Sequence, residues 1–385
     1  MTIGHSPRSA LMACALSAAG ALALASPVAA AAPTGADPGA AGRPGVTVPQ
    51  PAVLEHSGTQ VRPHAGAPDL PQVSALSWLV ADASTGQVLA AHDAHRQLPP
   101  ASTLKTLFAL TVLPTLPSGV RHTVSAEDLA GIGAGSSLVG VTEGNTYRVS
   151  DLWRGVFLNS GNDAVHVLAA LNGGWDHTAR QMQAKARALG ARDTHVLSPD
   201  GYDADGQVSS AYDLAVFGRA GLRNPDFARY CSTAEAAFPG ESGSTYEIAN
   251  TNRLLTGLHG VSPYPGLIGI KNGYTTNAGN TLVAAAHRGG RTLVVTVMNP
   301  RAGSVYEEAR GLLDWGFDAA GKVDPVGSLD GLRPVVHAAS VVTPAAVTVA
   351  GTDWPETGAV VGAAGLVVGA VLLTLRLRAG RARRD

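Results

Sequence analysis

The chain has 385 residues, of which 45% are hydrophobic and 15% charged, and its formal net charge is −1. A chain of this length and composition can bury a full hydrophobic core. The balanced charge gives no electrostatic basis for nucleic-acid binding. The histidines are scattered, and no His, Cys and carboxylate groups have the spacing of metal ligands. We therefore expect no nucleic-acid partner, no metal and no cofactor.

Both ends of the chain carry targeting patterns. Residues 1–31 combine Arg8, an apolar stretch over 11–24 and the small-residue segment SPVAAAAP, which is the layout of a cleaved secretory signal peptide. Residues 358–375 contain no charge and, at about 1.5 Å per residue, form a helix just long enough to cross a membrane. The arginines in 376–385 predict that this basic tail stays in the cytoplasm. The rest of the chain is expected to be exported.

Residues 32–71 are rich in Pro, Gly and Ala and are predicted to form a disordered linker, and 326–357 is predicted to be a second linker. The folded domain is expected between them, over 72–325. Hairpins are predicted over 77–93, turning at 84–86, and over 281–300, turning at Gly289–Gly290. Helices are predicted from about Ser102, over 151–171 with Ser150 as its cap, over 176–190 and 210–222, and over 305–319. Strands at both ends with helices between them predict an α+β fold, in which helices flank an antiparallel sheet and part of them form an inserted subdomain.

Of the two cysteines, Cys14 is expected to leave with the signal peptide, and Cys231 is predicted to be a small core residue.

Lysine is rare in this chain, which makes each lysine informative. There are only four, at positions 105, 185, 271 and 322, and arginine supplies the rest of the 28 basic residues. Lys105 follows Ser102 by three residues at the predicted start of a helix, so the two side chains lie on one face. A desolvated lysine can remove a proton from a serine hydroxyl, whereas arginine cannot act as a base. Ser-x-x-Lys alone is a weak signal that chance can also produce.

Two further segments carry polar residues in apolar surroundings. Ser160, Gly161 and Asn162 place a hydroxyl and an amide in close succession, although such residues often serve only the local backbone. Lys271 ends an apolar run that is predicted to be a strand, and the following Asn272-Gly273 is a turn or bulge signal. In isolation, Lys271 would be interpreted as a solvated cation.

The three segments occur in the order Ser-x-x-Lys, Ser-x-Asn and Lys-x-Gly, which is the set of motifs of β-lactamases and penicillin-binding proteins. Over residues 72–320 the chain resembles the serine-type D-alanyl-D-alanine carboxypeptidases of the low-molecular-mass penicillin-binding group. The resemblance extends to the segments VADASTGQVLAAHDAHRQLPPASTLK, LSPDGYDADGQVSSAYDLAVFGR and NTNRLL. It implies a β-lactamase/transpeptidase-like fold, a peptidoglycan stem peptide ending in D-Ala-D-Ala as substrate, and β-lactams as covalent inhibitors.

The resemblance also implies a role for each motif residue. Ser102 would be the acylated nucleophile, and Lys105 its general base, with a pKa lowered by burial and by the charge of Lys271. Ser160 would relay a proton to the leaving D-alanine, and Asn162 would steady the base and the substrate. Lys271 would attract the substrate carboxylate.

The third motif carries both the expected oxyanion hole and a departure from the family. The resemblance implies that the backbone N–H groups of Ser102 and Tyr274, the latter just after Gly273, form the oxyanion hole. The family usually has Lys-Thr-Gly where this chain has Lys-Asn272-Gly. Asn272 can donate through its amide, and Thr275 offers a hydroxyl two residues after Gly273.

Two other functions fit parts of the pattern. A class A β-lactamase shares the fold and motifs, but it deacylates through a glutamate in a Glu-x-x-x-Asn loop, and no glutamate occurs between Asn162 and Glu235. A non-catalytic surface module would keep the fold for binding. Such a module has no need of a titratable lysine beside a serine, so the catalytic reading is preferred.

The C-terminus is open to two interpretations. The residues Trp354-Pro355-Glu356-Thr357-Gly358 precede the apolar stretch, and they resemble a sortase signal with tryptophan in place of the usual leucine. Alternatively, the stretch is a plain membrane anchor with Trp354 at the interface. The membrane anchor is preferred because a leucine pocket would have to accept an indole.

Overall fold

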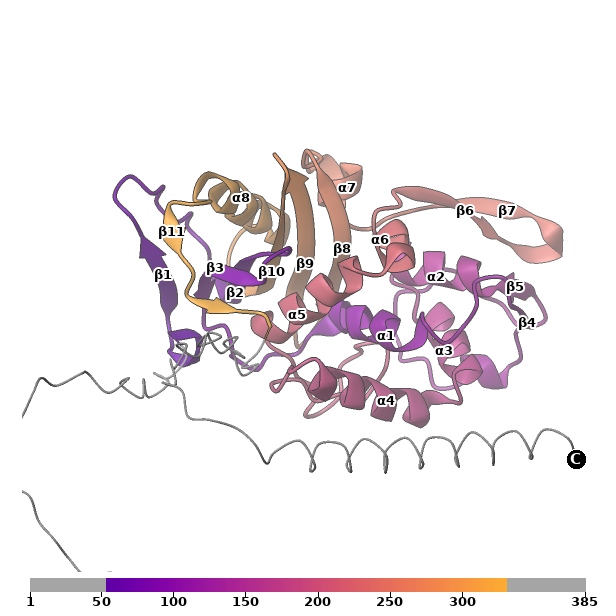
Figure 1. Ribbon diagram of the computed structural model, residues 1–385. Helices are drawn as coiled ribbons and strands as arrows, with labels where there is room; N and C mark the ends of the chain where they lie inside the picture. Colours follow the sequence, from indigo (N-terminus) through magenta and orange to yellow (C-terminus); the bar gives the residue numbers. More distant parts are fainter. Residues whose placement is uncertain (1–52, 331–385) are drawn as a thin grey trace, which may run out of the picture. The chain divides into compact units, whose positions relative to one another are not determined.

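The computed structural model describes residues 53–330 (Figure 1). The predicted signal peptide, the predicted membrane-spanning segment and the basic tail lie outside these residues. The described part contains an eight-stranded antiparallel sheet with the order β11-β1-β3-β2-β10-β9-β8, and β12 pairs with β3. Its strands are β1 (Thr59–Pro63), β2 (Ala75–Asp82), β3 (Gln87–His92), β8 (Leu267–Thr275), β9 (Gly279–Arg288), β10 (Arg291–Pro300), β11 (Val323–Asp324) and β12 (Gly327–Ser328).

Both predicted hairpins are confirmed. Strands β2 and β3 form the first, and β9 and β10 form the second, in which Arg288 pairs with Arg291. The two residues of the second turn, Gly289 and Gly290, have φ of +57° and +77°. A tight turn between twisted antiparallel strands requires such positive φ values, and glycine adopts them without strain.

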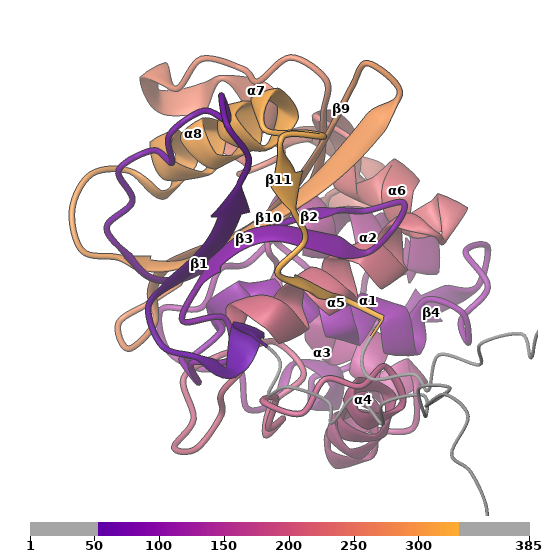
Figure 2. The same cartoon turned by 60° about the vertical axis from the view of Figure 1, so that its left-hand side comes forward.

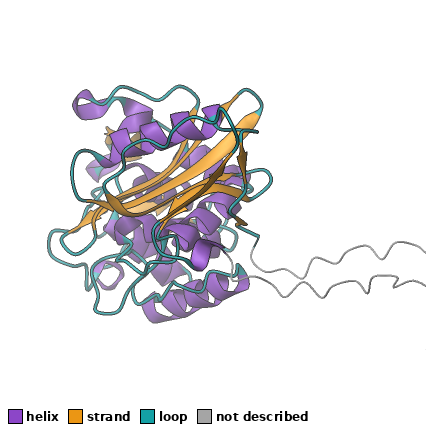
Figure 3. Ribbon diagram, turned by 90° about the vertical axis from the view of Figure 1, so that its left-hand side faces the viewer, coloured by secondary structure: helices purple, strands orange, loops and turns teal. Residues whose placement is uncertain are grey.

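Helices cover both faces of the sheet (Figures 2 and 3). Helix α8 (Val305–Asp318) packs on β10, β9 and β2 from one face, and α5 (Ala211–Leu222) packs on β10 and β2 from the other. Because both faces are buried, the central strands are nearly continuous apolar runs, as in the segment Leu293–Val295 of β10. The helices predicted over 210–222 and 305–319 are therefore confirmed.

The chain between β3 and β8 forms the helical part of the fold. It contains the 3-10 turn η2 (Ala101–Leu104) and, besides α5, the helices α1 (Lys105–Val112), α2 (Val149–Leu158), α3 (Asn162–Leu171), α4 (Trp175–Ala188), α6 (Pro225–Cys231) and α7 (Arg253–Thr256). It also contains two two-stranded sheets, β4 (Arg121–Thr123) with β5 (Thr146–Arg148) and β6 (Glu235–Pro239) with β7 (Thr245–Ala249). Helix α4 confirms the prediction for 176–190.

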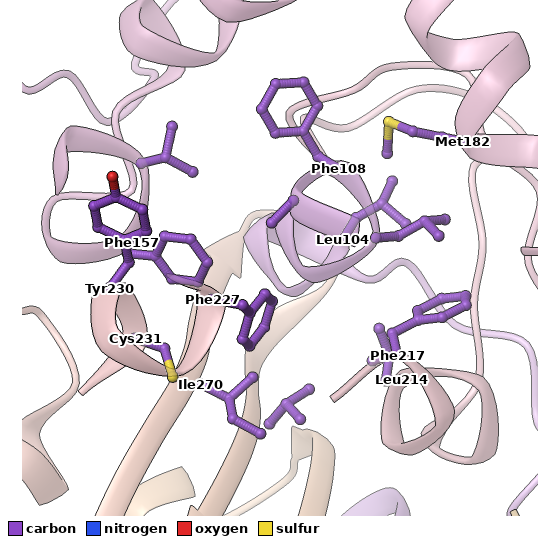
Figure 4. Packing of buried hydrophobic residues seen from close by; sticks show 14 of the residues in the cluster. Leu104, Phe108, Phe157, Met182, Leu214, Phe217, Phe227, Tyr230, Cys231 and Ile270 are labelled. Carbon is purple, nitrogen blue, oxygen red and sulfur yellow. The ribbon is translucent and has the colours of Figure 1, made fainter. Parts of the chain in front are cut away.

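One apolar core joins these helices to the sheet (Figure 4). Phe108 of α1, Phe157 of α2, Phe217 of α5 and Ile270 of β8 are buried in it. Cys231 lies in the same core as a free thiol, as predicted, and burial raises its pKa to about 12. A thiol held in this form is inert. The core fixes η2 with α1, which together carry the Ser-x-x-Lys motif, and β8, which carries the Lys-x-Gly motif.

The folded domain is longer at both ends than the predicted 72–325. Strand β1 lies within the predicted linker 32–71 and pairs with β3, from Thr59 opposite His92 to Val61 opposite Ala90. At the other end Arg219 of α5 donates to the carboxylate of Asp330 at 2.7 Å, beyond the predicted start of the second linker. The segment TQVRP is too short and polar to be predicted as a strand from the sequence. Its extended conformation depends on pairing with β3, which is distant in the chain.

The start of the helix after β5 also differs from the prediction. Ser150 is not its cap but its second residue, since α2 begins at Val149 and Arg148 occupies the cap position. The Asp151 carboxylate accepts the backbone N–H of Arg148 at 3.3 Å. An acidic side chain in the first turn replaces the serine cap that the sequence suggested.

Candidate active site

Ser102 lies in the η2 turn, directly before α1. The turn is anchored at Pro100, whose carbonyl oxygen accepts hydrogen bonds from the hydroxyls of Thr103 at 2.5 Å and Thr281 at 3.0 Å. Ala101 has a φ of +50°, a conformation that residues with a Cβ rarely adopt. The surroundings therefore hold the residue before Ser102 in a strained geometry, as is common at functional sites.

Two glycines pack against this turn at points where no side chain fits. A Cβ on Gly201, which has a φ of +78°, would lie 2.1 Å from the carbonyl oxygen of Ala101. A Cβ on Gly273 would lie 2.7 Å from the backbone nitrogen of Ser102. Strand β8 thus passes directly against the backbone of the predicted nucleophile, and the glycine of the third motif makes this approach possible.

Lys105 is buried beneath Ser102, and its amine contacts three oxygen atoms. Its Nζ atom lies 2.9 Å from Ser102 Oγ, 2.7 Å from Asn162 Oδ1 and 2.6 Å from the carbonyl oxygen of Asp200. The amine is therefore held by two fixed acceptors and directed at the serine hydroxyl. This is the geometry that a general base for Ser102 requires.

Burial changes the protonation of both lysines of the site. It lowers the pKa of Lys105 to about 8, although the Asp200 and Asp163 carboxylates act in the opposite direction. Burial also lowers the pKa of Lys271 well below its usual value, and the charge of Lys105 lowers it further. The prediction that burial lowers the pKa of Lys105 is confirmed, but the charge of Lys271 does not contribute to this shift. The effect runs in the other direction, from the charge of Lys105 to the pKa of Lys271.

Ser160 lies where the predicted helix 151–171 is broken. The segment forms two helices, α2 and α3, and Ser160 sits between them with a φ of +59°. Its hydroxyl is buried and has no hydrogen-bond partner within residues 53–330. A continuous helix is ruled out by this left-handed residue, which turns the chain so that Asn162 can start α3 at the site.

Asn162 connects Lys105 to a neighbouring loop. While its Oδ1 accepts from Lys105, its Nδ2 donates to the hydroxyl of Ser136 at 3.0 Å. Its backbone N–H donates to the carbonyl oxygen of Ser137 at 2.8 Å. Both ends of the Asn162 amide are therefore hydrogen-bonded, so its side chain is fixed and holds Lys105 in position.

Lys271 lies within β8, and the strand continues past it. Asn272 and Gly273 pair with Leu282 and Thr281 of β9, so the turn predicted at this point is wrong. The register shift of the strand occurs earlier, between Leu267 and Gly269. Local Asn-Gly propensity is overridden here by the ladder with β9.

The Lys271 ammonium is buried and remains close to its own strand. Its Nζ donates to the backbone carbonyl oxygen of Asn272 at 2.8 Å and lies 3.5 Å from the Oδ1 of the same residue. Tyr274 follows with an exposed ring, and the hydroxyl of Thr275 accepts the backbone N–H of Ala278 in the turn to β9. The hydroxyl of Thr275 thus belongs to the turn.

Comparisons with known proteins agree with this geometry. The family profile described as D-alanyl-D-alanine carboxypeptidase matches residues 64–302. The chain belongs to this family. It is similar to the D-alanyl-D-alanine carboxypeptidase DacB2 of Mycobacterium tuberculosis, with 43% identity over 271 residues that cover 69% of this chain and 89% of the relative. It is also 36% identical to DacD of Salmonella typhimurium over 65% of this chain and 64% of that protein.

Solved structures of carboxypeptidases and transpeptidases share the fold. The crystal structure of the D-alanyl-D-alanine carboxypeptidase of Mycobacterium tuberculosis matches with a TM-score of 0.64 and 39% identity, covering 70% of this chain and all of that one. The Streptomyces K15 DD-transpeptidase matches with a TM-score of 0.60 and 26% identity, covering 65% and 99% of the two chains. The α+β fold of the β-lactamase/transpeptidase type and the assignment as a serine carboxypeptidase are confirmed.

The structure adds two residues to this carboxypeptidase site that the motifs did not point to. Asp200 supplies the carbonyl oxygen that holds Lys105, and its carboxylate accepts the backbone N–H of Tyr202 at 2.9 Å. Asp163 holds the loop next to Asn162. Its carboxylate accepts the backbone N–H groups of Val139, Gly140, Val141 and Ala164. The segment SPDGYD resembles the family, but the role of Asp200 could not be predicted from its residue type, because Asp200 contacts Lys105 through its backbone carbonyl oxygen.

Residues 53–330 contain neither a metal-binding cluster nor a membrane-spanning helix. No group of three or more His, Cys, Asp or Glu side chains is placed to hold a metal ion there. None of the helices in this part of the carboxypeptidase is both long enough and apolar enough to cross a membrane.

Proposed function

We propose that this carboxypeptidase removes the terminal D-alanine of peptidoglycan stem peptides through an acyl-enzyme on Ser102. The observation that carries the proposal is the contact between the buried amine of Lys105 and Ser102 Oγ at 2.9 Å, with the amine held by Asn162 and Asp200. A lysine whose pKa is lowered to about 8 is in part neutral near pH 7, so it can accept the serine proton.

Acylation follows from this arrangement. The C-terminal carboxylate of the substrate binds at Lys271, and its negative charge stabilises the protonated form of that lysine. Ser102 Oγ bonds to the penultimate carbonyl carbon while its proton passes to Lys105. The backbone N–H groups of Ser102 and Tyr274 would stabilise the resulting oxyanion, an effect that contributes about 3 kcal/mol per donor in other enzymes.

Collapse of the tetrahedral state breaks the C–N bond. The hydroxyl of Ser160, which is buried and has no partner of its own in the site, would relay the proton to the departing D-alanine nitrogen. Water then attacks the acyl carbon while Lys105 takes up a proton of the water. The bond between the acyl carbon and Ser102 Oγ breaks, and Lys105 passes the proton to Oγ, so that the free hydroxyl and the neutral amine are restored. A β-lactam enters the same pathway, but its leaving group stays attached, so the adduct is long-lived.

The reaction is tested by incubating the purified protein with a D-Ala-D-Ala-terminated peptide and measuring released D-alanine. Release by the wild type and none by Ser102→Ala is expected. Equal release by both proteins would contradict the proposed nucleophile, and no release by either would contradict the proposed substrate. A third outcome, rapid hydrolysis of penicillin, would favour the β-lactamase alternative.

We further propose that the enzyme is exported by the signal peptide 1–31 and held at the outer face of the membrane by residues 358–375. The support is the apolar length of the second segment and the arginines of 376–385 that follow it. Fractionation of the producing cells, with sequencing of the C-terminal peptide, tests this. Detergent extraction with residues 359–385 intact is expected, whereas release only by wall-degrading enzymes with Thr357 as the last residue would show sortase attachment.

A further inference from the structure

Thr251 touches the chain segments of two catalytic motifs at once. It lies between β7 and α7, outside all three motifs. Its backbone N–H and its hydroxyl both reach the carbonyl oxygen of Leu158, at 2.9 and 3.1 Å, and Leu158 ends α2 two residues before Ser160. The same hydroxyl lies 3.1 Å from Oδ1 of Asn272 in β8. One side chain therefore spans the gap between the Ser160 segment and the Lys271 strand.

Thr251 is itself held in place from several sides. Its carbonyl oxygen accepts the hydroxyl of Tyr306 in α8 at 3.1 Å. Its neighbours Asn250 and Asn252 are buried, and the backbone N–H of Asn252 donates to Oδ1 of Asn250 at 2.9 Å. The side chain of Asn252 in turn caps α7 through the backbone N–H of Leu254 at 3.2 Å. The hydroxyl of Thr251 is thus presented by a rigid segment.

Asn272 links this hydroxyl to the carboxylate site, by which we mean Lys271 and the groups around it that would bind the substrate carboxylate. Its Oδ1 lies between Thr251 Oγ1 at 3.1 Å and Lys271 Nζ at 3.5 Å, and its backbone carbonyl oxygen accepts Lys271 Nζ at 2.8 Å. Both oxygens of Asn272 therefore face the cation, and the hydroxyl of Thr251 orients one of them. In the usual Lys-Thr-Gly motif the middle side chain is a shorter hydroxyl, whereas the longer amide here reaches Thr251.

We propose that Thr251 is a positioning residue for the carboxylate site, because it ties Asn272, and through it Lys271, to the end of α2, two residues before Ser160. This rests on the proposed function, since it concerns how Lys271 receives the substrate carboxylate. In this proposal the function of Asn272 is to position Lys271. The tie should act on carboxylate recognition and leave the Ser102–Lys105 pair unaffected.

The test compares Thr251→Val, which removes the hydroxyl at constant shape, with Thr251→Ser, which keeps it. Thr256→Val is the matched control, because within residues 53–330 the Thr256 hydroxyl bonds only to the carbonyl oxygen of Asn252 on the same segment. Each protein is assayed with a D-Ala-D-Ala peptide and with the same peptide carrying a C-terminal amide. Loss of one neutral hydrogen bond corresponds to roughly a fivefold effect.

We expect Thr251→Val to raise KM for the free-carboxylate peptide about fivefold with kcat within about twofold, and to leave the slow reaction of the amide peptide unchanged. Thr251→Ser and Thr256→Val should match the wild type. Equal losses on both peptides, or no loss, would overturn the proposal. A wild type that releases no D-alanine from either peptide would instead contradict the proposed function.

A double-mutant cycle with Asn272→Ala provides a second measurement, and its Asn272→Ala arm can be interpreted even if Thr251→Val folds poorly. If Thr251 acts through Asn272, the valine substitution has no further effect on KM in the Asn272→Ala background. Asn272→Ala alone should then reproduce the KM increase of Thr251→Val. Independent, multiplying effects of the two substitutions would show that Thr251 does not act through this amide.

Discussion

Raising the pH from 7 to 9 should accelerate the acylation of Ser102 about tenfold, because the neutral fraction of a base with a pKa near 8 rises from about one tenth to about nine tenths. The sign follows from the mechanism. Only the deprotonated amine of Lys105 can take the serine proton, and burial lowers its pKa so that deprotonation occurs within this range. An unperturbed lysine, with a pKa near 10.4, would be almost fully protonated over most of it.

The assay is the single-turnover rate of acylation by a fluorescent penicillin at saturating concentration, which separates chemistry from binding. Lys105→Arg serves as the control and should be slow at every pH, since guanidinium keeps the charge but cannot act as a base. Lys271→Arg should keep the rising profile but move its midpoint to lower pH, because a permanent cation near Lys105 disfavours its protonation.

Three outcomes of this experiment would refute the role given to Lys105. These are an acylation rate independent of pH, a rate that falls as the pH rises, and a midpoint near the pKa of an exposed lysine. Substantial activity of Lys105→Arg with the wild-type pH profile would also exclude this lysine as the base.

The other predictions concern the groups around the base. Gly201→Ala should lower the acylation rate by more than tenfold, since the new Cβ would lie 2.1 Å from the Ala101 carbonyl oxygen and displace the nucleophile turn; a rate within twofold of wild type would contradict this. Asp163→Asn should reduce the free energy of unfolding in urea by about 3 kcal/mol, because an amide cannot satisfy the backbone N–H groups that share both carboxylate oxygens. Lys271→Gln should raise KM for the peptide far more than it lowers kcat. A large fall in kcat with little change in KM would contradict the role of Lys271 in binding the substrate carboxylate.

The sequence predicted the two hairpins of the sheet and the strand of Lys271 because their signals are local, but it did not predict the short strands β1, β11 and β12. The hairpin at Gly289–Gly290 has two apolar runs around a turn that only glycine forms easily, so both strands and register follow. The motif residues Ser102, Lys105 and Lys271 could also be picked out from the local sequence, because such residue types are uncommon in apolar surroundings. The contact between Ser102 and Lys105 followed from their spacing at the predicted start of a helix.

The errors arose where tertiary contacts override local preference. The helix predicted over 151–171 is broken at Ser160, because the site holds this residue at a φ of +59° that no propensity indicates. Asn272-Gly273 is a turn or bulge signal in the sequence, but pairing with β9 keeps it in a regular strand. Thr251 was not identified at all, since its importance depends on two segments that are distant from it in the chain.

The central claim is that Ser102 is the residue acylated in this enzyme, and its most direct test is mass spectrometry of the protein after incubation with penicillin. The account predicts a single adduct on the proteolytic peptide that contains Ser102, and no adduct on Ser102→Ala. An adduct that persists in Ser102→Ala, or that maps to a different peptide in the wild type, would contradict it.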